Sequence, residues 1–202
     1  MNKGQIRAHF KALLNRTDCS DALADTFIDQ AITRIQRTLR IPSMEKTQNY
    51  TISAQVASII VPADLIEIMN IYSGQFTLSR VTLREMKQFK ELGETGTPKY
   101  FCRQGEDILL YPEPSSGTVS IDYYGQFADL TTDASENSLT VIASDLVTYA
   151  ALSYASDYFL DERGPLFEQK SGQFLAEVQE QANEAEQAGS LQTIRPANNF
   201  ID

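Results

Sequence analysis

The sequence lacks most of the side chains from which enzyme sites are commonly built. It has no tryptophan, two cysteines and one histidine, His9. A single histidine removes most zinc sites and leaves His9 as the sole conventional base for a Ser-His-Asp or Cys-His arrangement. The patterns G-x-x-x-x-G-K-[ST], G-x-G-x-x-G and D-x-D-x-D-G are also absent. These absences argue against nucleotide, metal and nucleophilic chemistry, and we expect no cofactor.

Long apolar runs are missing as well. No window approaches the ~18 consecutive apolar residues of a membrane span, and the N-terminal MNKGQIRAHF does not resemble a secretory signal. We therefore expect no membrane association and a protein that stays in the cytoplasm where it is made. In that reducing compartment Cys19 and Cys102 are expected to be free, mostly buried thiols, with a disulfide or a metal pair as the alternative.

Positive charge is scarce in the second half of the chain. Residues 1–103 carry 14 Lys and Arg against 10 Asp and Glu, or +4, whereas residues 104–188 carry 2 against 16, or −14. Arg195 and Asp202 cancel, which gives the net charge of −10. An acidic half argues against wrapping nucleic acid, because affinity for phosphates comes largely from Lys and Arg. A solvated face is one interpretation of it, and a surface that repels DNA is the other.

What is present begins with helical periodicity. Apolar residues at three- and four-residue steps predict helices over about 3–14 and 21–39. Ser20 is placed to cap the second helix, and Pro42 prevents its continuation.

The period then changes to that of strands and turns. Thr82 and Glu85 form a capping box, which predicts a short helix over about 83–91 that stops at Gly93. The predicted strands cover 50–54, 58–61, 65–72, 76–80, 100–103, 108–111 and 119–124.

Helical periodicity returns after a polar loop at about 129–138. Ser144 and Asp145 are placed to cap one helix, and Gly164-Pro165 separates it from a last helix that ends at Gly189. The predicted class is α+β: mainly an α-helical bundle of two N-terminal and two C-terminal helices, with an inserted small antiparallel β-rich module that carries one short helix. We expect residues 1–48 and 139–189 to form the bundle, 49–138 the module and 190–202 an extended tail.

This order of elements resembles the head-to-tail adaptor (connector) proteins of tailed bacteriophages. The resemblance covers roughly residues 20–185. It rests on VPADLIE at 61–67, RVTLRE at 80–85, GTPKYF at 96–101, ILLYPEP at 108–114 and VSIDYY at 119–124.

The resemblance implies a structural virion protein of the head-tail junction, assembled in the host cytoplasm and without enzymatic activity. Its copies would form a closed ring, commonly of twelve, below the portal protein. The ring would extend the DNA channel and provide the attachment platform for a downstream tail or nozzle protein. DNA would pass through the channel without specific binding.

Three sets of residues are candidate surfaces of such a ring. The glutamates of the last helix would face the channel, basic residues of the short helix would pair between subunits, and apolar tail residues would dock onto a neighbour. The acidic set is Glu177, Glu180, Glu184 and Glu186, the basic set is Arg84, Lys87 and Lys90, and the tail set is Leu191, Ile194, Phe200 and Ile201.

Two other function classes stay open at this point. Asp157 and Asp161, one helical turn apart, could form an acid pair of an enzyme, although an exposed helix end is the simpler explanation. Tyr111, Tyr123 and Tyr124 could line a sugar platform, but aromatic strand residues are usually core or rim. The basic short helix could instead mark a small nucleic-acid-binding module.

Overall fold

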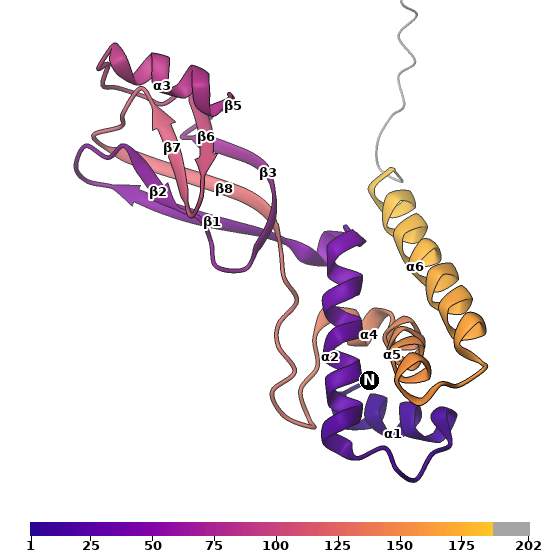
Figure 1. Cartoon of the computed structure of the whole chain (residues 1–202). Coiled ribbons are helices and arrows are strands. Elements are labelled where there is room, and N and C mark those ends of the chain that lie inside the picture. Colours follow the sequence, from indigo (N-terminus) through magenta and orange to yellow (C-terminus); the bar gives the residue numbers. More distant parts are fainter. Residues whose placement is uncertain (188–202) are drawn as a thin grey trace, which may run out of the picture. The chain divides into compact units, whose positions relative to one another are not determined.

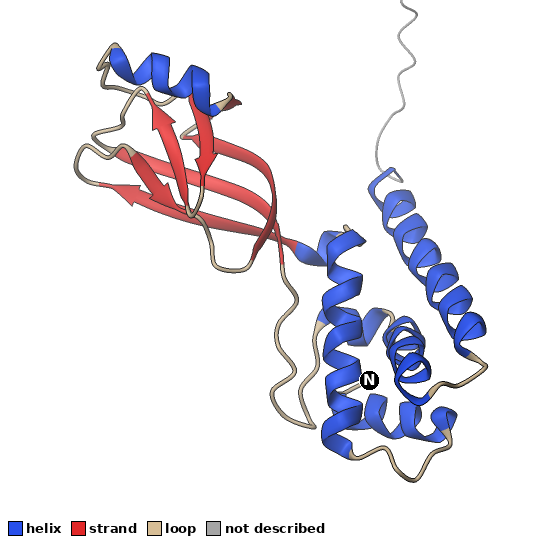
Figure 2. Ribbon diagram, viewed as in Figure 1, coloured by secondary structure: helices blue, strands red, loops and turns tan. Residues whose placement is uncertain are grey.

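The computed structural model describes residues 1–187, and the chain divides into two compact units. The helical unit contains residues 1–41 and the chain from residue 132 onward, and the β unit contains residues 42–131. Six α-helices and two mainly antiparallel sheets are found in the described residues, so the predicted α+β class is confirmed (Figures 1 and 2).

The helical unit is built around one apolar helix. Its helices are α1 (Lys3–Leu14), α2 (Asp21–Thr38), α4 (Ser138–Ile142), α5 (Ser144–Phe159) and α6 (Gly164–Gln187). Helix α5 packs against α1, α2 and α6. It is buried on several sides through Leu146, Val147, Ala151 and Leu152, as expected for a helix in the middle of a core.

The first two helices begin and end close to their predicted bounds because their caps are local. Asn2 accepts a hydrogen bond from the Gln5 backbone N–H (2.9 Å), and the Gln5 side chain accepts one from the Asn2 N–H (3.1 Å). Ser20 Oγ accepts from the Leu23 N–H at 3.2 Å, so the predicted cap of α2 is confirmed.

The predicted cap of α5 is wrong. The N-cap is Ala143, which makes no side-chain capping bond, and Ser144 already lies inside the helix. The short helix α4 directly precedes it, is capped by Asn137, and buries Leu139 and Thr140. Asp145, the other predicted capping residue, accepts from the Leu146 N–H at 2.8 Å, but it does so from within the first turn and not from the N-cap position.

The β unit contains two sheets packed on a common core (Figure 2). One has the strand order β1-β8-β3-β4 and the other β2-β7-β6-β5. The 3₁₀ turn Pro42–Met44 leads into the first strand. The strands are β1 (Glu45–Ile52), β2 (Ser58–Ile60), β3 (Leu65–Ser73), β4 (Phe76–Thr77), β5 (Ser79–Arg80), β6 (Tyr100–Gln104), β7 (Asp107–Tyr111) and β8 (Gly117–Gly125).

Two strand predictions need correction. The first strand occupies Glu45–Ile52 rather than 50–54, in register with β8 from Glu45↔Tyr124 to Ile52↔Gly117. The predicted strand 76–80 is split: β4 completes a hairpin with β3, whereas β5 pairs in parallel with β6 in the other sheet. Pairing with distant strands decides both cases, and a local pattern does not carry that information.

The short helix α3 (Leu83–Glu91) forms where the capping box predicts it. Thr82 Oγ1 accepts from the Glu85 N–H (3.3 Å), and Glu85 Oε2 accepts from the Thr82 N–H (2.8 Å). Its apolar side packs on the strands through the fully buried Met86 and through Phe89, which stacks on Tyr100 and Tyr111 at centroid distances of 5.0 and 5.5 Å. This packing leaves the basic side of α3 toward solvent.

Candidate interaction surfaces

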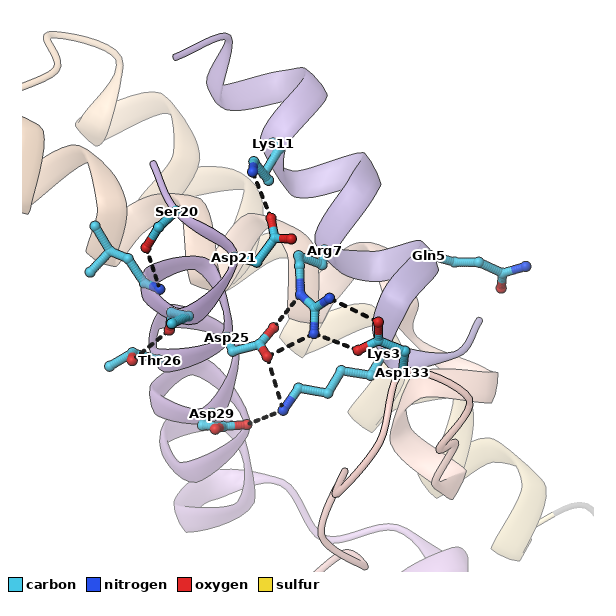
Figure 3. A network of polar contacts seen from close by, with 12 residues as sticks. Lys3, Gln5, Arg7, Lys11, Ser20, Asp21, Asp25, Thr26, Asp29 and Asp133 are labelled. Atoms are coloured by element: carbon cyan, nitrogen blue, oxygen red, sulfur yellow. Dashed lines mark hydrogen bonds and ion pairs between the residues drawn. The ribbon is translucent and has the colours of Figure 1, made fainter. Parts of the chain in front are cut away.

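A row of ion pairs joins α1 to α2. Cations recur every four residues on α1 and aspartates every four residues on α2, so each series lies along one helix face. The pairs are Lys11–Asp21 (2.7 Å), Arg7–Asp25 (2.6 Å) and Lys3–Asp29 (4.0 Å), as Figure 3 shows. The two series run in opposite directions, as antiparallel helices require. We call this set the α1–α2 ion-pair row.

Arg7 is the centre of this row. Its guanidinium donates to both oxygens of Asp25 (2.6 and 2.7 Å) and to both oxygens of Asp133 (2.7 and 3.1 Å), from the segment that follows the β unit (Figure 3). These hydrogen bonds raise the pKa of Arg7 and lower the pKa of Asp133. The arginine side chain is only 14% exposed. Because Arg7 is shielded from water, the centre of the row is expected to stabilise the helical unit.

The basic set of α3 is divided by the fold. Arg84 and Lys87 are exposed, and neither has an ion-pair partner among the described residues. Lys90 instead lies 3.9 Å from Glu113 Oε1 and donates to the Ala57 carbonyl at 3.4 Å. Thus Lys90 already has partners within its own chain, and the freely available cations of α3 are Arg84 and Lys87.

Two further arginines lie next to α3. Arg80 from β5 and Arg103 from β6 are exposed and line a shallow cavity of about 490 Å³ beside Thr82 and Glu85. Neither makes an ion pair within the described part of the chain. Arg80 was not predicted as part of the basic set, because only the pairing of β5 with β6 places it beside α3.

The glutamates of α6 also fall into two groups, those exposed to solvent and one that is paired within the unit. Glu177, Glu180 and Glu184 are exposed, and only Glu177 receives a side-chain hydrogen bond, from Gln173 at 2.7 Å. Glu168, by contrast, is paired with Arg34 of α2 and accepts from Ser153 Oγ (2.6 Å), and these hydrogen bonds lower its pKa to about 2. The side chain of Glu186 and the tail set Leu191, Ile194, Phe200 and Ile201 lie outside the described residues.

The turn from α5 to α6 is a tightly held corner. Asp161 forms hydrogen bonds with the Arg163 guanidinium (2.6 to 3.1 Å) and with its backbone N–H (3.0 Å), and together they lower the pKa of Asp161 to about 2. Arg163 also donates to the carbonyls of Leu13 and Leu14 at the end of α1 (3.2 and 3.0 Å). The corner borders a cavity of about 500 Å³.

Asp157 and Asp161 are not arranged as the acid pair of an enzyme would be, because only one of them is free of a cation among the described residues. Asp161 forms an ion pair with Arg163, and Asp157 is exposed on α5. Tyr111 and Tyr123 are 4% exposed and belong to the core of the β unit, so they cannot offer a platform to a sugar. His9 is exposed on α1.

Comparison with known protein families identifies the family of this chain. A family model described as "SU10 adaptor protein" matches residues 1–198. This chain belongs to the SU10 adaptor protein family. No curated protein matches it.

The SU10 adaptor family is a phage head-to-tail adaptor family, so the resemblance drawn from the sequence blocks at 61–124 is confirmed. The match extends beyond the predicted range of 20–185 and includes the α1–α2 ion-pair row. The family is structural and in general non-enzymatic, and membership makes this chain an adaptor component of a phage virion.

The described residues of this adaptor include neither a membrane-spanning helix nor a cluster of metal ligands. None of the helices up to residue 187 combines the length and apolarity needed to cross a bilayer. Over the same range, no three His, Cys, Asp or Glu side chains are grouped so that they could hold a metal ion. Cys19 and Cys102 are both free and buried, as predicted.

Proposed function

We propose that this adaptor forms a closed ring under the portal protein, extends the DNA channel and provides the attachment platform for a tail or nozzle protein. Family membership over residues 1–198 carries the proposal. The mechanism is geometric: subunits dock on one another and on their neighbours in the virion, and no covalent bond is made or broken. Twelve copies would match a twelve-membered portal.

A closed ring needs two different, complementary surfaces on each subunit, because its contacts are head-to-tail. Arg84 and Lys87, which are exposed and have no ion-pair partner among residues 1–187, support a basic inter-subunit surface on the β unit. Lys90 would contribute to that surface only by exchanging Glu113 for a carboxylate of the next copy. Such rim charges chiefly set orientation and the rate of association.

The acidic stripe of α6 is proposed to face the DNA path. Glu177, Glu180 and Glu184 are exposed and free of cationic partners within the described range, so their charge is available to solvent. Carboxylates and phosphates repel each other within a Debye length of ~8 Å. Together with Glu186 they would keep exiting DNA from adhering to the channel wall.

Neutralising this stripe tests its role. The variant with Gln at Glu177, Glu180, Glu184 and Glu186 should still assemble but eject DNA more slowly, as measured on particles that carry it. A matched control replaces four exposed acids elsewhere, Glu91, Glu106, Asp129 and Glu136, and should eject normally. Unchanged ejection in the first variant would remove the channel role.

The tail residues Leu191, Ile194, Phe200 and Ile201 are proposed as a latch onto the portal or onto the next ring member. Deleting residues 190–202 should leave a folded protein that fails to join the portal. Normal joining of the shortened protein would show that the tail is incidental.

The decisive experiment mixes the purified protein with the portal of the same virion and images the complex. A ring of twelve copies on the portal is expected. Failure to bind the portal, together with tight, salt-sensitive binding of duplex DNA by the lone protein, would instead favour a nucleic-acid-binding module.

A further inference from the structure

Several large apolar side chains at the α5–α6 corner are exposed to solvent. Leu160 is 89% exposed, Tyr158 63% and Leu166 48%, all within nine residues. Leu160 and Pro165 line the cavity of about 500 Å³ at this corner. Exposed apolar side chains gathered beside a hollow are typical of a surface that is covered in an assembly.

Leu160 is also an unusual residue for its backbone. It ends α5 in the left-handed conformation (φ 54°, ψ 44°), where glycine or asparagine is normally favoured. The same conformation at the end of α1 is taken by Asn15 (φ 54°, ψ 46°). Neither backbone preference nor burial accounts for a leucine at this position. A contact made outside the described residues would account for it.

The charges around the cavity leave one carboxylate available. Glu168 is held by Arg34 and Ser153, and Asp161 is held by Arg163. Asp157 also lines the cavity, is exposed, and its carboxylate makes no hydrogen bond or ion pair with the described residues. A segment that fits this surface should therefore combine apolar side chains with a single cation.

The corner is organised before anything binds it. The Asp161 N–H donates to the Ser156 carbonyl (2.8 Å), and the Gly164 N–H donates to the Asp161 carbonyl (3.0 Å). A Cβ at Gly164 would lie 3.0 Å from Ser156 Oγ, so the two helices meet there at close range. A partner that docks here would not have to order the corner first.

We infer that this corner receives the tail of the neighbouring copy, with Leu191 and Ile194 on the apolar surface of Leu160 and Pro165, and Arg195 beside Asp157. The segment SLQTIRP at 190–196 has the required chemistry: two spaced apolar residues and one cation, with no acid. The inference rests on the proposed ring and makes the latch a contact between ring members.

Chain length indicates that the contact is made with another copy. Helix α6 covers the 24 residues Gly164–Gln187, which places Gln187 about 35 Å from the corner and about 28 Å from Glu168 at the cavity's other edge. The seven steps from Gln187 to Ile194 span at most about 25 Å when fully extended. Ile194 therefore cannot return to its own corner, so a contact between the two requires a second copy.

Disulfide trapping tests the contact in the full-length chain. Pro165→Cys in the cavity and Thr193→Cys in the tail leave Leu160, Asp157, Ile194 and Arg195 unchanged, and the native cysteines are buried. When two chains that each carry one substitution are assembled on the portal and oxidised, a covalent dimer is expected. A chain with both substitutions should give a ladder up to the full ring. The control pair of Glu180→Cys with Thr193→Cys should remain unlinked.

Leu160→Asn is the second test, since asparagine suits the left-handed backbone. The variant should melt no lower than the wild type, yet need at least tenfold more protein for half-maximal ring formation on the portal. Leu92→Asn, at a leucine 67% exposed in the β unit, should assemble normally.

Charge exchange provides the third test. Asp157→Arg and Arg195→Asp should each weaken assembly, and their combination should restore it.

Failure of the inference is distinguishable from failure of the proposed function. A wild-type chain that forms no ring on the portal contradicts the proposed function. Rings that form normally but show only monomers after oxidation, or links to the portal, overturn the inference alone, as does normal assembly of the Leu160→Asn variant.

Discussion

The two units of this adaptor use their charges differently. In the helical unit, Arg7 and Arg34 are engaged with carboxylates from other segments of the same unit, and Arg163 is engaged with Asp161 of its own turn. In the β unit, Lys46 and Lys90 have carboxylate partners, but a cluster of cations around α3 has none among the described residues. That cluster consists of Arg80, Arg84, Lys87, Lys99 and Arg103, all of them exposed.

The difference indicates where stability and assembly are located. Ion pairs between segments that are partly shielded from water hold helices together, and breaking one leaves a charge without compensation. Exposed unpaired cations contribute little to folding but remain free to meet a partner. We therefore expect substitutions of the ion-paired arginines of the helical unit to affect stability, and substitutions of the exposed cations around α3 to affect assembly.

The largest effect is expected from Arg7→Met, which keeps the apolar stem but removes the guanidinium. Asp25 and Asp133 then lose their main partner, and the free energy of unfolding should fall by about 2–3 kcal/mol. Urea unfolding followed by far-UV circular dichroism measures this change.

Lys11→Met is the matched control at the other end of the α1–α2 ion-pair row. Its pair with Asp21 is exposed (35% and 68%), so its loss should stay below about 1 kcal/mol. Equal losses for the two variants would contradict the idea that shielding gives the row its strength.

Acid should weaken the helical unit through Glu168 and Asp161. The folded-state pKa of both is about 2, against ordinary values of 4.5 and 3.8. Because the folded pKa values are depressed, the stabilisation is present above pH 4.5 and is lost as the pH falls toward 2. Glu168 is 48% exposed, so after allowance for solvent screening the combined loss should be about 1–2 kcal/mol. Melting temperatures across this window should fall less steeply for Glu168→Gln than for the wild type.

The contrast between local and distant interactions also explains what could be predicted from the sequence. Helices α1, α2 and α3 lie where they were expected because their signals are local: an apolar stripe, Ser20 as a cap, and the Thr82–Glu85 capping box. The start of β1 was missed because residues 45–49 are mostly polar, and only pairing with β8 makes them a strand.

The candidate surfaces follow the same division. The sequence places Arg84, Lys87 and Glu177 on outward faces, since a helix with a known apolar side determines its polar side. It does not reveal that Lys90 meets Glu113 or that Glu168 meets Arg34, because these partners come from distant segments. The α1–α2 ion-pair row was not predicted, although two four-residue periods of opposite charge were a signal for it; the pairing itself required the packing of the two helices.

Alkali should weaken the β unit, in contrast to the acid sensitivity of the helical unit. Burial, together with a hydrogen bond from its hydroxyl to Asp64 (2.9 Å), raises the pKa of Tyr123 to about 12. Since the folded pKa is raised from 10.0, the stabilisation is complete below pH 10 and is lost as the pH rises through 12. Tyr123→Phe should cost about 1 kcal/mol near neutrality and abolish this dependence. The chain has nine tyrosines and no tryptophan, so the difference in tyrosine absorbance between wild type and variant reports the titration of Tyr123. A difference curve without a step near pH 12 would refute the assignment.

The smallest effect on stability is expected for the double variant Arg84→Ala, Lys87→Ala. Both side chains are exposed and lack ion-pair partners in the described range, so the free energy of unfolding should change by less than about 0.5 kcal/mol. Ring formation on the portal should nevertheless be slower and lose part of its salt dependence, because these charges would guide the approach of the next subunit. Gln88→Ala, at an exposed neutral position of the same helix, controls for the change in side-chain size. Normal assembly kinetics with normal stability would show that Arg84 and Lys87 only solvate the surface. The contrast between stabilising ion pairs in the helical unit and assembling cations around α3 would then have to be abandoned.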